Sequence, residues 1–296
     1  MASPPVIAQQ SVAGAIIDQA TIFALFAETT ATQAEPRRIA HFHAQFDPLL
    51  PGFYRRATPA TQAALDAQIA AALLAFPDNR AAFTRTTASF GPAFTAAQER
   101  FRQTFADYTL TMPVYLIQSF GQMDGGTRMI GGKPAMLFGA DVIAKIHDDT
   151  TIGPFLDHEL FHIYHARFFP DCAAIWCSLW QEGLAVHVAA RMNPGANDRQ
   201  LELTEPRPIR AELAGRIPQA MCFVRKRLDS TRDRDYAALF LGSGKRGKFP
   251  PRFGYLVGAM LAERIGATLT LEEMAKLPPD AVKLRLAAVL ASYARC

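Results

Sequence analysis

Apolar residues recur three and four positions apart in the first third of the chain, the spacing that gathers them on one face of a helix. Thr58 and Pro59 predict an N-cap followed by proline at the first helical position, and Pro77 predicts the end of that helix. We expect residues 1–110 to form a helical N-terminal region packed on a core of residues 111–296. The segments with the helical spacing are Ile16–Ala31, Pro36–Phe46, Thr61–Phe76 and Phe94–Phe105.

The pattern of residues changes at Met112, after which it is typical of β-strands. Pro113–Ile117 is short, β-branched and aromatic. Lys133–Phe138, continued through Val142–Ile146 with a kink at Gly139, predicts a second strand. Gly121–Gly132 is a glycine-rich connection, so these features predict an antiparallel hairpin with a long, mobile loop.

Helical spacing returns after Gly153 and Pro154 and continues to the end of the chain. We therefore expect an α+β fold that is mostly α, with a small antiparallel sheet. A basic, Gly- and Pro-rich loop, Gly242–Pro251, interrupts the helices. Besides the segment that follows Pro154, the helices are expected at Leu179–Arg191, Pro206–Arg227, Asp235–Leu241, Phe253–Ile265, Leu271–Leu277 and Pro279–Tyr293.

His158, Glu159 and His162 form the motif His-Glu-x-x-His. Positions four apart share one face of a helix, so the two imidazoles can hold one Zn²⁺ and Glu159 can reach a water on the metal. The usual chemistry is hydrolysis, in which the metal polarises a carbonyl and the Glu takes a proton from the water. Apolar neighbours such as Leu160 predict a half-buried helix. The alternative is a pair of histidines with a structural role.

A catalytic zinc requires a third protein ligand. His165 lies about 10 Å along the helix axis from His158, beyond a metal held by the pair, so the ligand is expected from another segment. Glu182 is the better candidate, and Gly183 beside it would let two helices approach closely. The alternative for Glu182 is an acid that interacts with the helix dipole. His165 and His187 are expected to support the site or to lie at the surface.

These residues carry a resemblance to a known family. A His-Glu-x-x-His helix followed, after nineteen intervening residues, by Glu in a second helix resembles the gluzincin metallopeptidases. More narrowly, the chain is similar to the DUF2268 family of predicted zinc-dependent proteases over roughly residues 110–275. That similarity lies in the Gly125–Thr127 turn, the Glu182–Ala185 string and the Arg252–Gly258 string.

The resemblance implies a zincin-like core with one zinc per chain at His158, His162 and Glu182, and Glu159 as general base. It also implies that Tyr255 donates to a developing oxyanion, with Arg252 as a second candidate. Tyr255 as an ordinary core aromatic residue remains open.

Two further features follow from the comparison with gluzincins. Lys133–Phe138 is placed to be the edge strand that pairs with a substrate backbone, or it is an ordinary sheet strand. Thermolysin-like enzymes carry Asp four residues after the ligand Glu, where this chain has Val186. Another carboxylate or carbonyl must then fix the imidazoles, and Asp157 is expected to project away from the ligand face.

Composition narrows the class of protein. The chain has 296 residues, of which 50% are apolar and 20% charged, with a net charge of +4; these values exclude a mainly disordered chain. The 20 prolines and 19 glycines follow no fixed period, which excludes a fibrous repeat. No run of about 18 uncharged apolar residues occurs, so no membrane span is expected.

Two basic motifs do not predict a nucleotide or nucleic-acid site. Gly242–Lys248 has the glycine and lysine spacing of a P-loop, but Phe249 replaces the required Ser or Thr and two prolines follow it. A flexible basic loop is expected there instead. The Arg225–Arg227 cluster is short and has no aromatic stacking platform, so no nucleic-acid partner is expected.

Cys172, Cys177, Cys222 and Cys296 form no C-x-x-C pair, which argues against an all-cysteine zinc site. A disulfide between Cys172 and Cys177, or from that segment to Cys222, is favoured over four thiols. Disulfides favour a secreted or periplasmic location over the cytoplasm. The N-terminus lacks the basic and apolar regions of a signal peptide, which leaves open a mature exported protein or a cytosolic start.

The sequence therefore predicts a zinc-dependent peptidase that acts on a peptide or protein substrate, with Glu159 as general base. The alternative is a catalytically silent, zinc-stabilised binding or regulatory protein that retains the same site. A third reading, a metal-free helical binding protein, requires the motif to be accidental.

Overall fold

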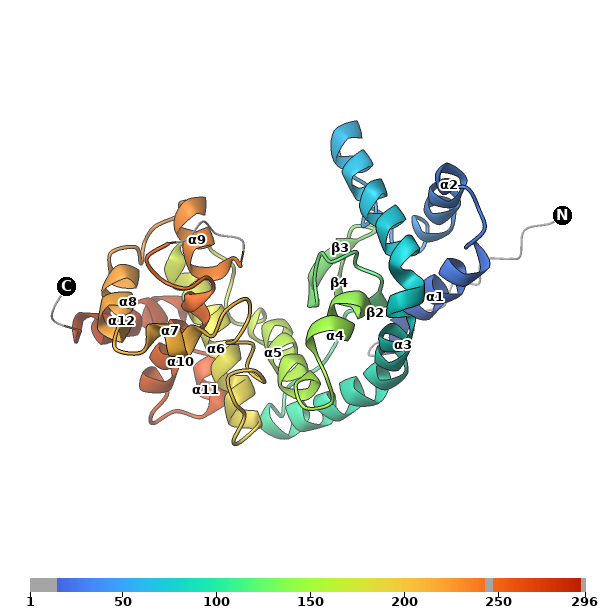
Figure 1. The fold of residues 1–296 in the computed structure, drawn as a ribbon. Helices are drawn as coiled ribbons and strands as arrows, with labels where there is room; N and C mark the ends of the chain where they lie inside the picture. The colour runs from blue at the N-terminus through green and yellow to red at the C-terminus, as the bar shows by residue number, and fades with distance from the viewer. Residues whose placement is uncertain (1–14, 243–246, 294–296) are drawn as a thin grey trace. The chain divides into compact units, whose positions relative to one another are not determined.

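The computed structural model describes residues 15–242 and 247–293 (Figure 1). The chain divides into two compact units. The sheet unit comprises Met1–Ala93 and Leu110–Asp148, and the helical unit comprises Phe94–Thr109 and Asp149–Cys296. The expected division near residue 110 does not coincide with these units, because the sheet belongs with the N-terminal helices.

The described part of the sheet unit contains four strands, and α1, α2 and α3 lie between β1 and β2 in sequence. The strands lie in the order β1-β2-β4-β3, with β1–β2 and β2–β4 parallel and β3–β4 antiparallel. The sheet is thus mixed, and the expectation of an antiparallel sheet is wrong. The elements are β1 (Ile16–Asp18), α1 (Ala20–Thr29), α2 (Glu35–Phe46), the first part of α3 (Pro59–Thr104), β2 (Val114–Ile117), β3 (Gly125–Ile130), β4 (Lys133–Gly139) and α4 (Ala140–Ile146).

The hairpin expected from the sequence forms between different segments. Gly131 and Gly132 adopt φ values of 56° and 79°, which glycine tolerates best, and they turn β3 directly into β4. The glycine-rich connection therefore contains a strand of its own. Val142–Ile146, expected to extend a strand, lies in α4.

β4 lies between β2 and β3, so the prediction that Lys133–Phe138 forms an edge strand is wrong. Among the described strands, β1 and β3 occupy the two edges. The glycine turn pairs β4 with β3 along one edge, and β2 pairs with β4 along the other edge.

Helix α3 runs through Pro77 and Pro92, contrary to the predicted end at Pro77. An interior proline costs a helix about 3 kcal/mol. Burial of a phenylalanine contributes about 1.5–3 kcal/mol, and α3 buries one long apolar stripe. That stripe includes Leu65, Ile69, Leu73, Phe76, Phe83, Phe90, Phe94, Ala97 and Phe101, and its helical spacing continues across both prolines.

The core of the sheet unit is an aromatic cluster around Phe23 of α1. Its ring lies within 6.4 Å, centroid to centroid, of five other phenylalanine rings. Phe120, held at φ 55° just after β2, completes this cluster from the sheet side. The five rings belong to Phe42, Phe46, Phe76, Phe83 and Phe120.

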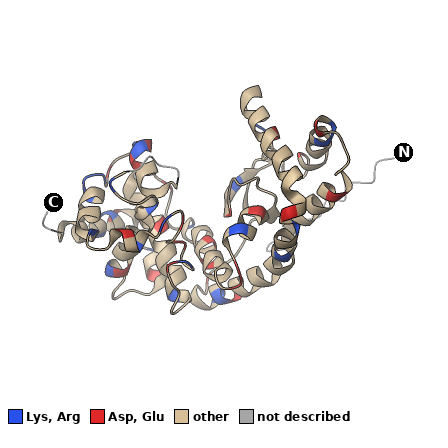
Figure 2. Ribbon diagram, viewed as in Figure 1, with Lys and Arg blue, Asp and Glu red and all other residues tan. Residues whose placement is uncertain are grey.

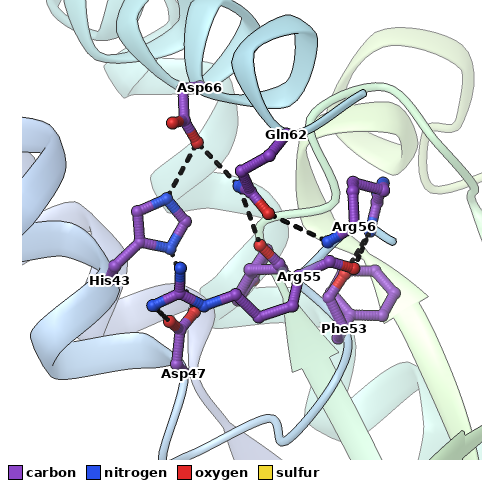
Figure 3. A network of polar contacts seen from close by, with 8 residues as sticks. His43, Asp47, Phe53, Arg55, Arg56, Gln62 and Asp66 are labelled. Atoms are coloured by element: carbon purple, nitrogen blue, oxygen red, sulfur yellow. Dashed lines mark hydrogen bonds and ion pairs between the residues drawn. The ribbon is translucent and has the colours of Figure 1, made fainter. Parts of the chain in front are cut away.

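A polar network joins α2 to α3 beside this core (Figure 3). His43 Nδ1 lies 3.1 Å from Asp47 Oδ1, and Nε2 lies 2.9 Å from Asp66 Oδ1. Arg55 pairs with Asp47, and the Gln62 amide donates to Asp66 over 2.8 Å. Each carboxylate thus has a second donor besides the imidazole.

The helical unit is built on three central helices, α5, α6 and α10. Acidic and basic residues are interspersed along its described helices (Figure 2). None of the described helices combines the length and hydrophobicity needed to cross a membrane. The unit contains the end of α3 and α5 (Ile152–His165), α6 (Ile175–Met192), α7 (Ile209–Leu213), α8 (Ile217–Arg225), α9 (Asp233–Phe240), α10 (Phe253–Ile265), α11 (Leu271–Ala275) and α12 (Pro279–Ala291).

Most helices predicted for this half of the chain form where the apolar spacing placed them. The expected Pro206–Arg227 helix is instead two helices, α7 and α8, separated at Gly215, whose φ of 71° suits glycine and ends α7. Residues 243–246 of the predicted basic loop lie outside the described residues.

Candidate metal centre

Helix α5 carries His158, Glu159 and His162. Its opposite face is fully buried, with Leu156, Leu160 and Tyr164 inaccessible to solvent, and this burial fixes which face points away from the core. Tyr164 also donates to Asp107 over 2.7 Å, which ties the helix to the segment after α3. This buried face and the bond to Asp107 set the orientation of the helix, and with it the direction in which the two histidines project.

Glu182 lies on α6, where a close helix crossing sets its position. Gly183 packs directly on Gly258 of α10, and a Cβ atom at either position would overlap the backbone of the other helix. The expectation that Gly183 permits close approach of two helices agrees with this packing. The crossing fixes the register of α6 at the residue next to Glu182.

The three predicted ligand residues converge on one point. His162 Nε2 lies 3.0 Å from His158 Nε2, and Glu182 Oε2 lies 3.6 Å from His158 Nε2 and 3.4 Å from His162 Nε2. Ligand atoms at about 2.1 Å from a tetrahedral zinc are about 3.4 Å from one another. The observed separations fit one zinc ion without rearrangement, and the set of two imidazoles and one carboxylate suits zinc chemistry.

The charges of this group favour a cation. Burial works against charge on His162, but the Glu182 carboxylate outweighs it and raises the pKa of His162 to about 9. Burial likewise opposes an ionised Glu182, yet the two imidazoles hold the pKa of Glu182 well below its usual range. Burial lowers the pKa of His158 despite its contact with Glu182. Without metal, these shifts favour a protonated His162 paired with an ionised Glu182.

Glu159 lies on α5 between the two histidines, and its carboxylate is close enough to contribute to the raised pKa of His162. It is half-buried, unlike the fully buried residues on the far side of the helix. This position is consistent with the predicted access of Glu159 to the space beside a metal.

Tyr255 of α10 lies beside the ligand group. Its ring centroid is 6.4 Å from that of His158, and the Arg252 guanidinium lies 4.6 Å above the Tyr255 ring. Burial, followed by the charge of Glu182, raises the pKa of Tyr255, so the phenol stays protonated and can donate a hydrogen bond. Arg252, at φ 62°, also contacts Glu202 at 3.4 Å. The structure thus brings both oxyanion candidates to the same side of the cluster.

The other predicted residues near the motif lie elsewhere. His165 is buried between the rings of Phe161 and Phe169, at 5.1 and 4.9 Å, and burial lowers its pKa to about 3. His187 is also buried with a lowered pKa, near Arg191. Neither histidine belongs to the ligand group.

Asp157 points away from the ligand face, as expected. Both of its carboxylate oxygens accept from Arg100, at 3.2 and 3.3 Å, and one accepts from Asn193 over 2.8 Å. Because Asp157 is fully buried and precedes His158, these bonds hold the start of the motif in place.

Tyr236 and Glu202 were missed by sequence reasoning. Tyr236 of α9 stacks at 5.2 Å on Phe240, which lies 5.8 Å from Tyr255. Burial, followed by the charge of Glu182, raises the pKa of Tyr236, so the phenol is within electrostatic range of the candidate metal centre. The one sequence signal for Tyr236 is its four-residue spacing from Phe240, which places both residues on the same face of a helix.

The connection between the two ligand helices is closed by a disulfide. Cys172 and Cys177 are bonded, and no cysteine in the described part of the chain is a free thiol. Backbone N–H groups of Ile175 and Trp176 donate to carbonyls of Ser230 and Leu228, at 2.9 and 3.0 Å. The start of α6 is thereby held from both sides.

Comparisons of the chain with family models, with curated proteins and with solved structures gave no match. The resemblance to gluzincins therefore stays an expectation from the sequence motif.

Proposed function

We propose that this protein is a zinc-dependent peptidase. The observation that supports it best is the convergence of His158, His162 and Glu182 at separations of 3.0 to 3.6 Å, with Glu159 on the same helix as the two histidines. Zinc bound there would polarise a peptide carbonyl and make a water molecule more acidic.

The chain's own residues supply the remaining roles. Glu159 accepts the proton of the attacking water as general base and passes it towards the leaving amine. Tyr255 donates a hydrogen bond from its protonated phenol to the carbonyl oxygen as negative charge develops on it. Arg252, which lies over the Tyr255 ring, adds positive charge on the same side.

Metal content tests the ligand assignment. Protein purified without a nickel column is expected to contain about one zinc per chain by elemental mass spectrometry. Glu182→Ala is expected to lose most of that zinc, whereas Glu99→Ala, which removes an exposed carboxylate from α3, is expected to retain it. No zinc in the parent protein after zinc is added back would refute the site.

A peptidase assay then tests the reaction. A panel of peptides and denatured proteins should be cleaved by the zinc-loaded protein, and a chelator should abolish cleavage. A protein that binds stoichiometric zinc but cleaves nothing in the panel would instead be the zinc-stabilised binding protein described above.

A further inference from the structure

The helical unit contains a pocket with a volume of about 410 Å³. One wall is a cluster of three phenylalanines, Phe223, Phe249 and Phe253, whose ring centroids lie 5.0 to 5.8 Å apart. Ala237 and Leu241 of the α9 segment line the facing side, and Leu241 is 42% exposed. The volume falls in the range of small-molecule sites, and the walls are mainly apolar.

Two cations lie beside Phe249, one of the phenylalanines that line the pocket. The Lys248 ammonium lies 5.8 Å from the Phe249 ring centroid, and the Arg216 guanidinium lies 5.1 Å from it. Arg216 also donates to the backbone carbonyl of Lys248, which ties its guanidinium to the segment that carries Lys248. Arg207 lines the pocket as well, but its charge is balanced by Glu212 at 2.6 Å.

Negative charge is missing from the same walls. No described residue that lines the pocket is an aspartate or glutamate, and Lys248 and Arg216 have no carboxylate partner within the described ranges. A mainly apolar cavity with two unbalanced cations beside one of its phenylalanines complements a molecule with an apolar body and one anionic end.

We propose that this pocket binds a small amphiphilic carboxylate, with its hydrocarbon body on the three phenylalanines and its carboxylate at Lys248 and Arg216. A nucleotide fits less well, because its several phosphate charges would meet only these two unbalanced cations. The P-loop spacing in Gly242–Lys248 also lacks the hydroxyl residue that holds magnesium.

The pocket and the candidate metal centre lie against different faces of two shared segments, α9 and the start of α10. On α9, Tyr236 and Phe240 form the stack that leads to Tyr255, whereas Ala237 lines the pocket. Phe253 lines the pocket, and Arg252 beside it lies over Tyr255. Carboxylate binding is therefore independent of the metal, and it is expected to persist in metal-free Glu182→Ala protein.

Isothermal titration calorimetry with octanoate tests the proposal, with 1-octanol, butyrate and ATP as comparison ligands. Octanoate is expected to bind at least tenfold more tightly than 1-octanol, which lacks the charge, and than butyrate, which lacks the body. Lys248→Met should weaken octanoate binding about tenfold, while Lys248→Arg should preserve it. Ala237→Leu should fill the pocket and weaken octanoate binding by a similar factor or more.

Circular dichroism of each variant separates lost binding from lost folding. No measurable octanoate binding to the parent protein would overturn the proposal. Equal binding of 1-octanol, tighter binding of ATP, or unchanged octanoate binding in folded Lys248→Met and Ala237→Leu would also overturn it.

Discussion

The two units each contain a buried histidine with acidic neighbours, and the difference between them shows what makes a metal site. In the sheet unit, His43 turns its two ring nitrogens towards two carboxylates on opposite sides. In the helical unit, His158 and His162 each turn one nitrogen towards the same point, and Glu182 faces that point as well. The first arrangement joins two helices, whereas the second gathers three ligand atoms around a space for one cation.

The balance of charge differs in the same way. Arg55 pairs with Asp47 and the Gln62 amide donates to Asp66, so each carboxylate beside His43 has a second partner. In the helical unit the raised pKa of His162 and the lowered pKa of Glu182 favour a protonated imidazole paired with an ionised carboxylate. Metal binding at these residues would release the proton of His162, because an imidazole ligates a metal in its neutral form.

The largest effect is expected on peptide cleavage, in a variant whose zinc content should not change. Glu159→Gln keeps the size of the side chain but cannot accept a proton, so peptide cleavage should fall about 10²- to 10⁴-fold. Zinc content by elemental mass spectrometry should stay at the parent level. Glu99→Gln is the matched control, and cleavage retained in Glu159→Gln would show that another group acts as the base.

Paired glycine substitutions should distinguish the packing of the two units. Gly183→Ala forces a methyl group against the backbone of Gly258 and should destabilise the helical unit by about 3 kcal/mol. Trp176 and Trp180, the chain's two tryptophans, both lie on α6, so urea unfolding followed by tryptophan fluorescence reports this unit.

Gly91→Ala in α3 is the control of opposite sign. Its methyl group would meet only the end of Ile16, at 4.0 Å, and alanine should stabilise the helix by about 0.5–1 kcal/mol. Urea unfolding followed by far-ultraviolet circular dichroism measures this change. Equal destabilisation by both substitutions would mean that the α6–α10 crossing is not unusually tight.

His165 predicts a dependence on pH that is confined to the helical unit. Burial lowers its pKa to about 3 in the folded protein, against an ordinary value of 6.5, so between pH 6.5 and pH 3 mainly the unfolded chain takes up the proton. The contribution of neutral His165 to the free energy of unfolding is fully present above pH 6.5 and is lost as the pH falls towards 3. The variant His165→Phe has no such loss. At pH 5, about 1.5 units below the ordinary pKa, it should be more stable than the parent by about 2 kcal/mol, at about 1.36 kcal/mol per unit.

Unfolding of metal-free protein at pH 5 and pH 8, followed by tryptophan fluorescence, tests this expectation. The gain in His165→Phe should be present at pH 5 and nearly absent at pH 8. A gain of the same size at both values would mean that packing, rather than protonation, is responsible.

The smallest expected effect belongs to the sheet unit. His43→Gln reaches only one of the two carboxylates, and the loss of one hydrogen bond should cost about 1 kcal/mol of stability. Urea unfolding followed by far-ultraviolet circular dichroism measures the loss. Zinc content should be unchanged, and a fall in zinc content would show that the two histidine clusters are not independent.

Local spacing predicted the helical unit better than the sheet unit. The α10 helix begins at Phe253 and ends at Ile265, as its apolar spacing indicated, because its pattern repeats within a few residues. The pairing of β2 with β4 depends on which distant segment covers each strand, and no local pattern specifies that choice. The passage of α3 through Pro77 has the same origin, since burial of a long stripe outweighs a local signal.

The same division applies to the candidate site. His158, Glu159 and His162 were identified because their spacing carries the chemistry on one helix. Glu182 required a motif in a second helix, with Gly183 as the local signal. Tyr236 belongs to a helix far along the chain, and only the packing of Phe240 against Tyr255 brings it to the cluster.

The division of the chain into units determines how it can be taken apart. Residues 94–109 belong to the helical unit, yet they are separated from the rest of it by a stretch of the sheet unit. A fragment that begins at Asp149 would lack Arg100 and Asp107, the partners of buried Asp157 and of Tyr164. Neither unit can therefore be obtained by a single cut, and a minimal fragment that carries the candidate metal centre would need residues 94–109 joined to residue 149 by a linker.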